Sequence, residues 1–314
     1  MLAVLVLAGS AHASQLIDRN ANDVRLMTNA KGEAMLTYKV GGKLKHVLVW
    51  GAINAKQPNP NEKQVKFSVD YSGGWGKYNR KIANYWTTFG NKCAGYDGPD
   101  LPFFITGCHA PDGSLWAVQS WQVPLPDLGF TPWTAQLSAY ELHISHWKGP
   151  IAQLEVWSDW IYGGKFHDLF GHATYDGRPI YGFGTTSVGA PTDRFGRLIY
   201  LDTLDAPNYG SGWQRENSFV PHNPTGVFCY GFYTFDPTKG GYVHPSGQTA
   251  MRGPGVGKQY RLTLDGPGVT PDVQVMIDDP GDYDANDPSK VAYEKQQNAE
   301  LDSILNGDKL CRQH

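Results

Sequence analysis

The strongest constraint on the fold is that the chain divides into short β-prone runs separated by turn residues. Residues 33–40 and 43–50 read EAMLTYKV and KLKHVLVW and are joined by Gly41-Gly42. Two β-rich runs connected by Gly-Gly predict a β-hairpin. Further runs bounded by Gly, Pro, Asn or Asp predict strands over 65–71, 116–123, 137–147, 151–162, 197–201, 227–235, 260–264 and 273–277.

The composition supports a β protein. The chain contains 37 Gly and 21 Pro, 13% of its residues are aromatic, and only 18% are charged. Many turns and many rings with few charges are typical of turn-rich β structure rather than a helical bundle. The net charge is −3, without a run of Lys or Arg. Because a phosphate backbone requires a basic face, nucleic acid is not an expected partner.

One helix is predicted near the C-terminus. Asp287 is a suitable N-cap, Pro288 suits the first helical position, and Gly307 suits the residue beyond the helix. No interdomain linker is evident in the sequence. We therefore predict a mainly β chain, with an antiparallel β-sandwich or jelly-roll-like domain over 14–286 and a C-terminal helix and tail over 287–314.

The first thirteen residues are predicted to be a secretory signal peptide. The apolar run from Leu2 to Ala8 leads to Ala11-His12-Ala13, a small-x-small triplet of the kind that signal peptidase cleaves. No Lys or Arg precedes this run, so we expect the signal peptide to be truncated at its start; the alternative is that the segment is not a signal peptide. The run is too short for a membrane span, which needs roughly 20 apolar residues. A secreted, extracellular protein without a membrane span is therefore expected.

Four cysteines follow the predicted cleavage site. Cys93 and Cys108 enclose a loop rich in Gly, Pro and Asp, and we predict that they pair. Closing a loop of this size stabilises the fold by ~3 kcal/mol in the chain-entropy description. Cys229 and Cys311 are the remaining pair, which ties the tail to the β domain. The alternative is that the thiols are free and buried.

The segment 140–160 is predicted to form a second hairpin around the turn Lys148-Gly149-Pro150. Alternation sets Leu142 and Ile144 on one face of the first strand. Pairing Trp147 with Ile151 matches apolar residues across the two strands, which favours this register.

The other face of this hairpin, expected to be open, carries the predicted site. The register places His143 opposite Glu155 and Glu141 opposite Trp157, with Asp159 in the same row. Diagonal neighbours lie ~7–8 Å apart, so the two Glu carboxyls reach the separation of roughly 5–9.5 Å used by glycosidases. We predict Glu141 and Glu155 as the catalytic pair, His143 as the group that tunes Glu155, and Trp157 and Asp159 as sugar-binding residues. The alternative is a solvated cross-strand pair worth under ~1 kcal/mol.

Two further groups of polar residues are candidates for a site. Glu216 and His222 lie in a polar stretch that we interpret as a loop between a Gly-rich segment and an aromatic strand. Glu216 is the substitute catalytic residue, His222 is a candidate substrate-binding residue, and local pairing or turn capping is the alternative. A metal-dependent hydrolase is a third possibility, with the ligands His167, Asp168, His172 and His222.

No cofactor is predicted. Asp282, Asp284 and Asn286 have the spacing of the first calcium ligands of an EF-hand, but Asp287 and Tyr293 occupy the positions that require Gly and Glu. An acidic turn before a capped helix explains the same residues.

These patterns predict a secreted protein that engages a polysaccharide or cell-wall polymer, with glycoside hydrolysis by paired carboxylates as its catalytic form. The alternative is a non-catalytic envelope or matrix protein. Burial of Trp157 and its row separates the two, because a binding face must be exposed.

Overall fold

The structure is a computed structural model. It describes residues 14–51, 53, 65–79, 84–124, 138–160, 164–166, 168–180, 184–185, 191–192, 199–205, 212–219, 227–234, 257–264 and 270–305. Over this part of the chain the fold is mainly antiparallel β with one α-helix near the C-terminus, which confirms the predicted fold class.

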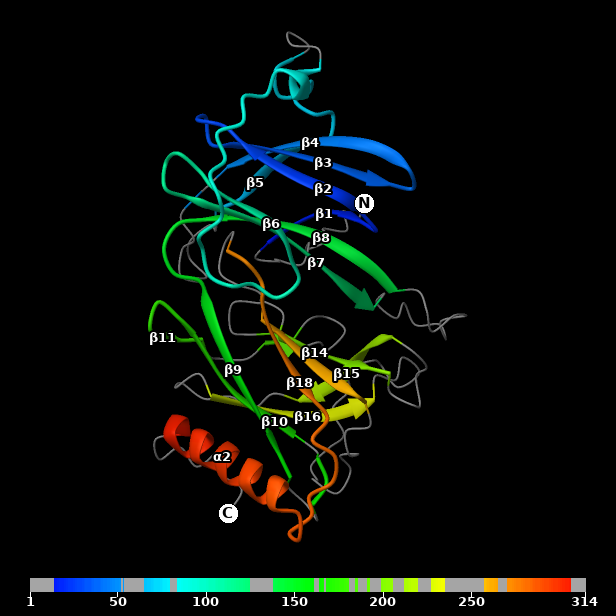
Figure 1. The fold of residues 1–314 in the computed structure, drawn as a ribbon, viewed down its shortest axis with the longest axis vertical. Coiled ribbons are helices and arrows are strands. Elements are labelled where there is room, and N and C mark those ends of the chain that lie inside the picture. Colours follow the sequence, from blue (N-terminus) through cyan, green and yellow to red (C-terminus); the bar gives the residue numbers. More distant parts are fainter. Residues whose placement is uncertain are drawn as a thin grey trace, which may run out of the picture.

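The first half of the chain forms two four-stranded antiparallel sheets, which we call the N-terminal sandwich. The sheets have the strand orders β1-β8-β7-β6 and β2-β3-β4-β5 and lie one above the other (Figure 1). The strands are β1 (Gln15–Arg19), β2 (Asn22–Thr28), β3 (Glu33–Val40), β4 (Lys43–Gly51), β5 (Phe67–Asp70), β6 (Phe104–His109), β7 (Leu115–Pro124) and β8 (Ser138–Trp147).

The predicted Gly-Gly hairpin is β3 and β4. Val40 pairs with Lys43, and both connecting glycines have positive φ, 55° at Gly41 and 77° at Gly42. Alternation along β3 then sends Leu36 and Tyr38 into the core between the sheets. Residues of both sheets fill that core, including Val47, Val49, Trp116, Val118, Leu142 and Ile144.

The outer face of the hairpin is covered as well. Met35 and Leu48 point away from the sandwich core and pack against Tyr85 and Phe89. Tyr85 begins a short 3₁₀ helix, η1 (Tyr85–Thr87). Because both faces of β3 are buried, its run of consecutive apolar residues is explained by packing on two sides.

The predicted disulfide between Cys93 and Cys108 is present, with the two Cα atoms 5.3 Å apart. It joins the segment after η1 to β6, beside the backbone pairing of Ala94 with His109. The second predicted pair, Cys229 with Cys311, falls outside the described side chains.

The second half of the chain forms an eight-stranded antiparallel sheet, which we call the C-terminal sheet. Its order is β11-β10-β16-β15-β14-β17-β18, and β9 pairs with the other side of β10. A short pair, β12 (Gly184–Thr185) with β13 (Pro191–Thr192), is separate. The strands of the large sheet are β9 (Ala152–Asp159), β10 (Asp168–Tyr175), β11 (Arg178–Pro179), β14 (Ile199–Leu204), β15 (Trp213–Phe219), β16 (Val227–Thr234), β17 (Gln259–Leu264) and β18 (Val273–Asp278).

The predicted helix is α2 (Pro288–Leu305), which lies beside β9 and β10 (Figure 1). Asp287 caps it as expected, because its Oδ1 accepts a hydrogen bond from the Ser289 N–H at 2.9 Å. Tyr293 and Gln297 of α2 both contact Ser158 of β9. These polar contacts, together with packing of Tyr293 on Trp160, fix the helix on the sheet.

The predicted hairpin over 140–160 is wrong. β8 pairs with β7 and β1, whereas β9 pairs with β10, so the two strands belong to different sheets. Lys148-Gly149-Pro150 links the N-terminal sandwich to the C-terminal sheet. Glu141 is consequently not a cross-strand neighbour of Trp157, and His143 is not opposite Glu155.

A buried carboxylate holds the segment that covers the hairpin. Glu33 at the start of β3 is only 1% exposed and accepts hydrogen bonds from the Lys77 ammonium and the Tyr78 hydroxyl, both at 2.6 Å. Tyr85 and Asn29 donate to its other oxygen. Burial alone would raise the pKa of Glu33, but these hydrogen bonds outweigh it and lower the pKa to about 2.

We expect Glu33→Ala to destabilise the protein by roughly 3–5 kcal/mol, because it leaves the buried donors without their acceptor. Since the folded pKa lies below the unfolded value, the stabilisation by Glu33 is complete above about pH 5 and is lost as the pH falls toward 2. Urea unfolding at pH 7 and pH 3 measures both effects. A Glu33→Gln variant whose stability falls as steeply with acid as that of the wild type would contradict this assignment.

Candidate functional site

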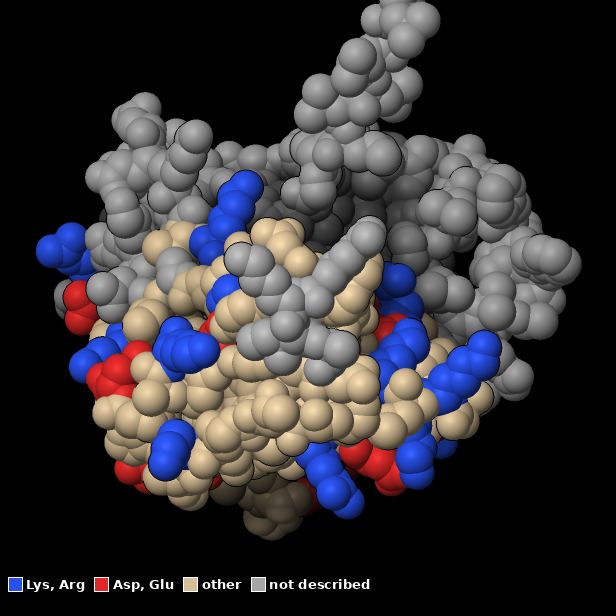
Figure 2. Space-filling view, turned by 90° about the horizontal axis from the view of Figure 1, so that it is seen from above, with Lys and Arg blue, Asp and Glu red and all other residues tan. Residues whose placement is uncertain are grey.

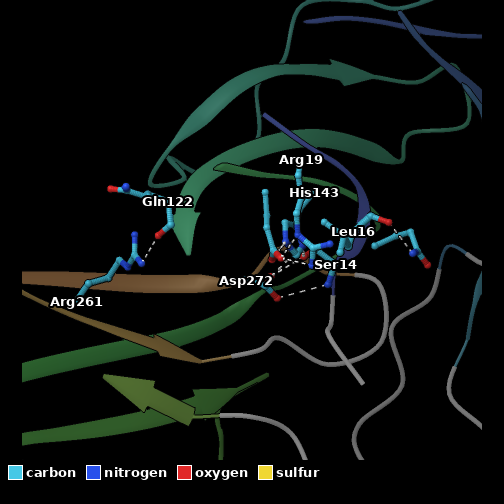
Figure 3. Close-up of polar contacts among 9 residues, drawn as sticks. Ser14, Leu16, Arg19, Gln122, His143, Arg261 and Asp272 are labelled. Carbon is cyan, nitrogen blue, oxygen red and sulfur yellow. Dashed lines mark hydrogen bonds and ion pairs between the residues drawn. The ribbon is translucent and has the colours of Figure 1, made fainter. Parts of the chain in front are cut away.

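The face of β8 that carries Glu141 and His143 is buried at the seam between the N-terminal sandwich and the C-terminal sheet. The two side chains share one face, as predicted, but His143 is only 1% exposed and Glu141 is 8% exposed. Ser14, which precedes β1, and Asp272, which precedes β18, meet them there (Figure 3). The site therefore joins three segments that are distant in the sequence.

His143 is at the centre of this cluster. Its Nδ1 lies 2.8 Å from the Ser14 hydroxyl oxygen and its Nε2 lies 3.2 Å from Oε2 of Glu141. Its ring stacks on Trp121 of β7, with 4.3 Å between the ring centroids. The Ser14 hydroxyl also contacts Oδ2 of Asp272 at 2.5 Å. His143 thus contacts Glu141, whereas the sequence had assigned it to Glu155.

Glu141 is held by an arginine on the neighbouring strand. β1 places Arg19 directly opposite Glu141, and the guanidinium donates to Oε1 from Nε at 3.0 Å and from Nη2 at 2.7 Å. Burial would raise the pKa of Glu141, but the hydrogen bonds from His143 and Arg19 outweigh it and lower the pKa to about 2. Glu141 is therefore ionised at neutral pH.

A hydroxyl, an imidazole and a carboxylate that contact one another in this order can form a catalytic triad. In a triad the imidazole is the base that activates the hydroxyl, and the carboxylate orients the imidazole. In this protein Ser14 is 2% exposed, so its hydroxyl does not face solvent. A nucleophile must reach the substrate, and the cluster is closed in this structure. In this arrangement the cluster is a set of buried hydrogen bonds that joins the two halves of the fold.

The second predicted group lies on β9, in the C-terminal sheet. Gln153, Glu155 and Trp157 alternate along one face of this strand, and we call them the β9 row. Gln153 and Glu155 are exposed, and Trp157 is half-buried. β10 sets His172 opposite Glu155, with 3.7 Å between Nδ1 and Oε2. This contact was missed because Glu155 was assigned to His143 in the predicted hairpin.

The remaining predicted residues are only partly placed. Glu216 lies in β15, opposite Thr234, rather than in a loop as expected, and β16 and β10 separate its strand from β9. Asp159 ends β9 opposite Asp168. The side chains of Glu216, Asp159 and Asp168 lie outside the described part of the structure, as do His167 and His222 entirely. Within the described residues, no three His, Cys, Asp or Glu residues gather as potential metal ligands.

A second charged contact at the seam was not anticipated from the sequence. Arg261 of β17 is fully buried, and its Nη2 donates to Oδ2 of Asp202 at 2.7 Å. The same nitrogen donates to the carbonyl of Gln122 at 2.6 Å (Figure 3). Its guanidinium lies 4.4 Å from the ring centroid of Trp213 and 5.5 Å from that of Phe103. Because Gln122 and Phe103 belong to the N-terminal sandwich, Arg261 links the two halves.

The chain matches no protein-family model, and comparison with the curated proteins and with the solved structures finds no match. The geometry of the site is therefore interpreted from its own residues. No helix in the described part of the chain has the length and apolarity that crossing a membrane requires.

Replacing Arg19 tests the importance of the cluster for stability. Arg19→Met removes two charge-assisted hydrogen bonds from the largely buried Glu141, so we expect a loss of roughly 1.5–3 kcal/mol in the free energy of unfolding. Lys39→Met is the matched control, since Lys39 pairs with Asp23 at 2.8 Å on the surface. An exposed pair contributes under ~1 kcal/mol. Equal losses from the two substitutions, measured by urea unfolding, would show that the Arg19 contact is no more than a surface ion pair.

Proposed function

We propose that the protein binds a polysaccharide or cell-wall polymer through the β9 row without hydrolysing it. The single observation that supports this proposal most is the half-buried Trp157 beside the exposed Glu155, whose side chain is 61% accessible. Ser158 and Trp160 contact α2, and because successive residues of a strand point to opposite faces, Trp157 points away from the helix.

The chemistry of this row suits a sugar. An indole offers a rigid apolar surface on which the C–H face of a pyranose ring can stack, and its N–H remains available as a donor. The Glu155 carboxylate accepts hydrogen bonds from hydroxyl groups, and the Gln153 amide both donates and accepts. The three residues recur at every second position, about 6.6–6.8 Å apart along the strand. Such a row suits an extended polymer better than a small compact ligand.

The proposal is limited to binding because Glu141 and Glu155 lie on strands of different sheets. Glycoside hydrolysis requires two carboxyl groups roughly 5–9.5 Å apart, one of them protonated. Glu141 belongs to the other sheet, and its pKa of about 2 keeps it ionised at neutral pH. It is therefore unsuited to act as the general acid.

The surface of the N-terminal sandwich offers a useful comparison. Viewed from above, blue and red side chains of both signs are scattered around a broad tan area (Figure 2). Trp75, in the turn segment after β5, is 43% exposed. An exposed indole is thus also present far from β9 in the sequence, and it serves as an internal control for non-specific stacking.

The proposal is tested by depletion of the purified protein with a panel of insoluble polysaccharides. We expect selective binding, a loss of roughly tenfold in affinity for Trp157→Ala, and partial retention for Trp157→Phe, because a stacked, buried ring contributes on the order of 1–2 kcal/mol. Trp75→Ala is expected to bind as the wild type does. Thermal unfolding of each variant checks that the fold is intact.

Absence of binding to every polymer would remove the proposal and favour the non-catalytic envelope or matrix alternative. Equal losses for Trp157→Ala and Trp75→Ala would reduce the effect to non-specific adhesion.

A further inference from the structure

The backbone nitrogen of Ser14 lies against a buried carboxylate. Its N–H donates to Oδ1 of Asp272 at 3.4 Å, while the hydroxyl of the same residue contacts Oδ2 at 2.5 Å (Figure 3). Ser14 is 2% exposed and Asp272 is fully buried. The backbone nitrogen and the hydroxyl oxygen of Ser14 therefore contact the two oxygens of one carboxylate.

The sequence places a predicted cleavage site at this same nitrogen. Ala11-His12-Ala13 is the small-x-small triplet, and cleavage after Ala13 makes Ser14 the first residue. The contact with Asp272 and the predicted cleavage site are independent observations that concern the same nitrogen.

We propose that cleavage after Ala13 converts the Ser14 nitrogen into an α-ammonium group that forms a buried ion pair with Asp272 and locks the seam of the fold. A leader peptidase hydrolyses the Ala13–Ser14 bond with one water molecule. Ala13 leaves with the new carboxylate, and the Ser14 nitrogen becomes an amine that takes up a proton near neutral pH, since α-amino groups have pKa values of ~7.7–8.0. A neutral amide donor is thereby replaced by a cation with three N–H donors.

The surroundings suit this added charge. The cluster contains two buried carboxylates, Asp272 and Glu141, with His143 between them. Arg19 contacts Glu141, and the α-ammonium would replace the Ser14 amide donor that contacts Asp272. An ion pair in a buried site is favourable when the remaining polar atoms are hydrogen-bonded, and the Ser14 hydroxyl provides such a bond to Asp272.

The ion pair acts across the seam. Ser14 leads directly into β1 of the N-terminal sandwich, whereas Asp272 leads into β18 of the C-terminal sheet. Gln119 of β7 also donates to the carbonyl of Asp272, at 3.4 Å. Removal of the leader therefore adds a charged contact between the halves at a point where they already touch. The inference is independent of the proposed polysaccharide binding, because none of these residues belongs to the β9 row.

The first test is the N-terminus of the protein exported from a host cell, determined by intact mass and peptide sequencing. We expect it to be Ser14. An exported protein that begins at any other residue would overturn the proposal.

The second test compares the chain beginning at Ser14 with the same chain carrying one extra Ala before it. We expect the extra residue to lower the Tm by about 3 °C or more. In an Asp272→Asn background the two forms should unfold within about 1 °C of each other, because the partner of the ammonium has been removed. Asp278→Asn is the matched control in β18 and should preserve the full difference. Equal Tm values for the two wild-type forms, or the same difference in the Asp272→Asn background, would refute the ion pair.

Chemical reactivity provides a readout if Asp272→Asn does not fold. A buried, paired α-ammonium should react with an acetylating N-hydroxysuccinimide ester at least about tenfold more slowly in the native protein than in urea. Lys39 is partly exposed and serves as the reference amine, since its rate should change little. Equal protection factors for Ser14 and Lys39 would show that the amine is not buried in the seam.

Discussion

The architecture depends on how the N-terminal sandwich and the C-terminal sheet bury charge against each other. An ionised group removed from water must be paired or hydrogen-bonded, because its desolvation otherwise costs several kcal/mol. At this seam Arg261 pairs with Asp202 and reaches across to the Gln122 carbonyl. Directional contacts of this kind specify one relative placement of the two halves, whereas apolar surfaces alone tolerate sliding. The seam is therefore a constraint on geometry as much as a contribution to stability.

The parts of the fold that the sequence predicted well are those decided by local chemistry. The hairpin at Gly41-Gly42 follows from two positions that need positive φ, and α2 follows from the cap at Asp287. The alternation of β8 was also predicted correctly, with Leu142 in the sandwich core and His143 on the opposite face. In each case the information lies within a few residues of the element that it specifies.

The wrong predictions concern which strand each strand pairs with and which segment covers its faces. Lys148-Gly149-Pro150 shows that the chain turns, but it does not determine whether the next strand pairs with the previous one or begins another sheet. The opposite face of β8 was expected to be open because its residues are polar, yet it is covered by a segment more than a hundred residues away. Single residues such as Ser14 and Asp272, which are 258 positions apart, leave no periodic signal by which their contact could be predicted. β15 was interpreted as a loop because its polar side chains, Arg215 to Ser218, obscured the β pattern.

The two groups of residues first combined into one site have opposite physical characters. Glu141 and His143 have the reactive chemistry, but they are buried and committed to partners within the fold. On the β9 row Glu155 is exposed and Trp157 is half-buried, and Glu155 lies opposite His172, with 3.7 Å between its Oε2 and the Nδ1 of His172. A substitution on the β9 row should therefore leave the seam intact, whereas a substitution in the seam changes the stability of the fold that carries the row. Because the two groups lie on different sheets, the polysaccharide binding that we propose for the β9 row is physically separable from the charge pairing that fixes the fold.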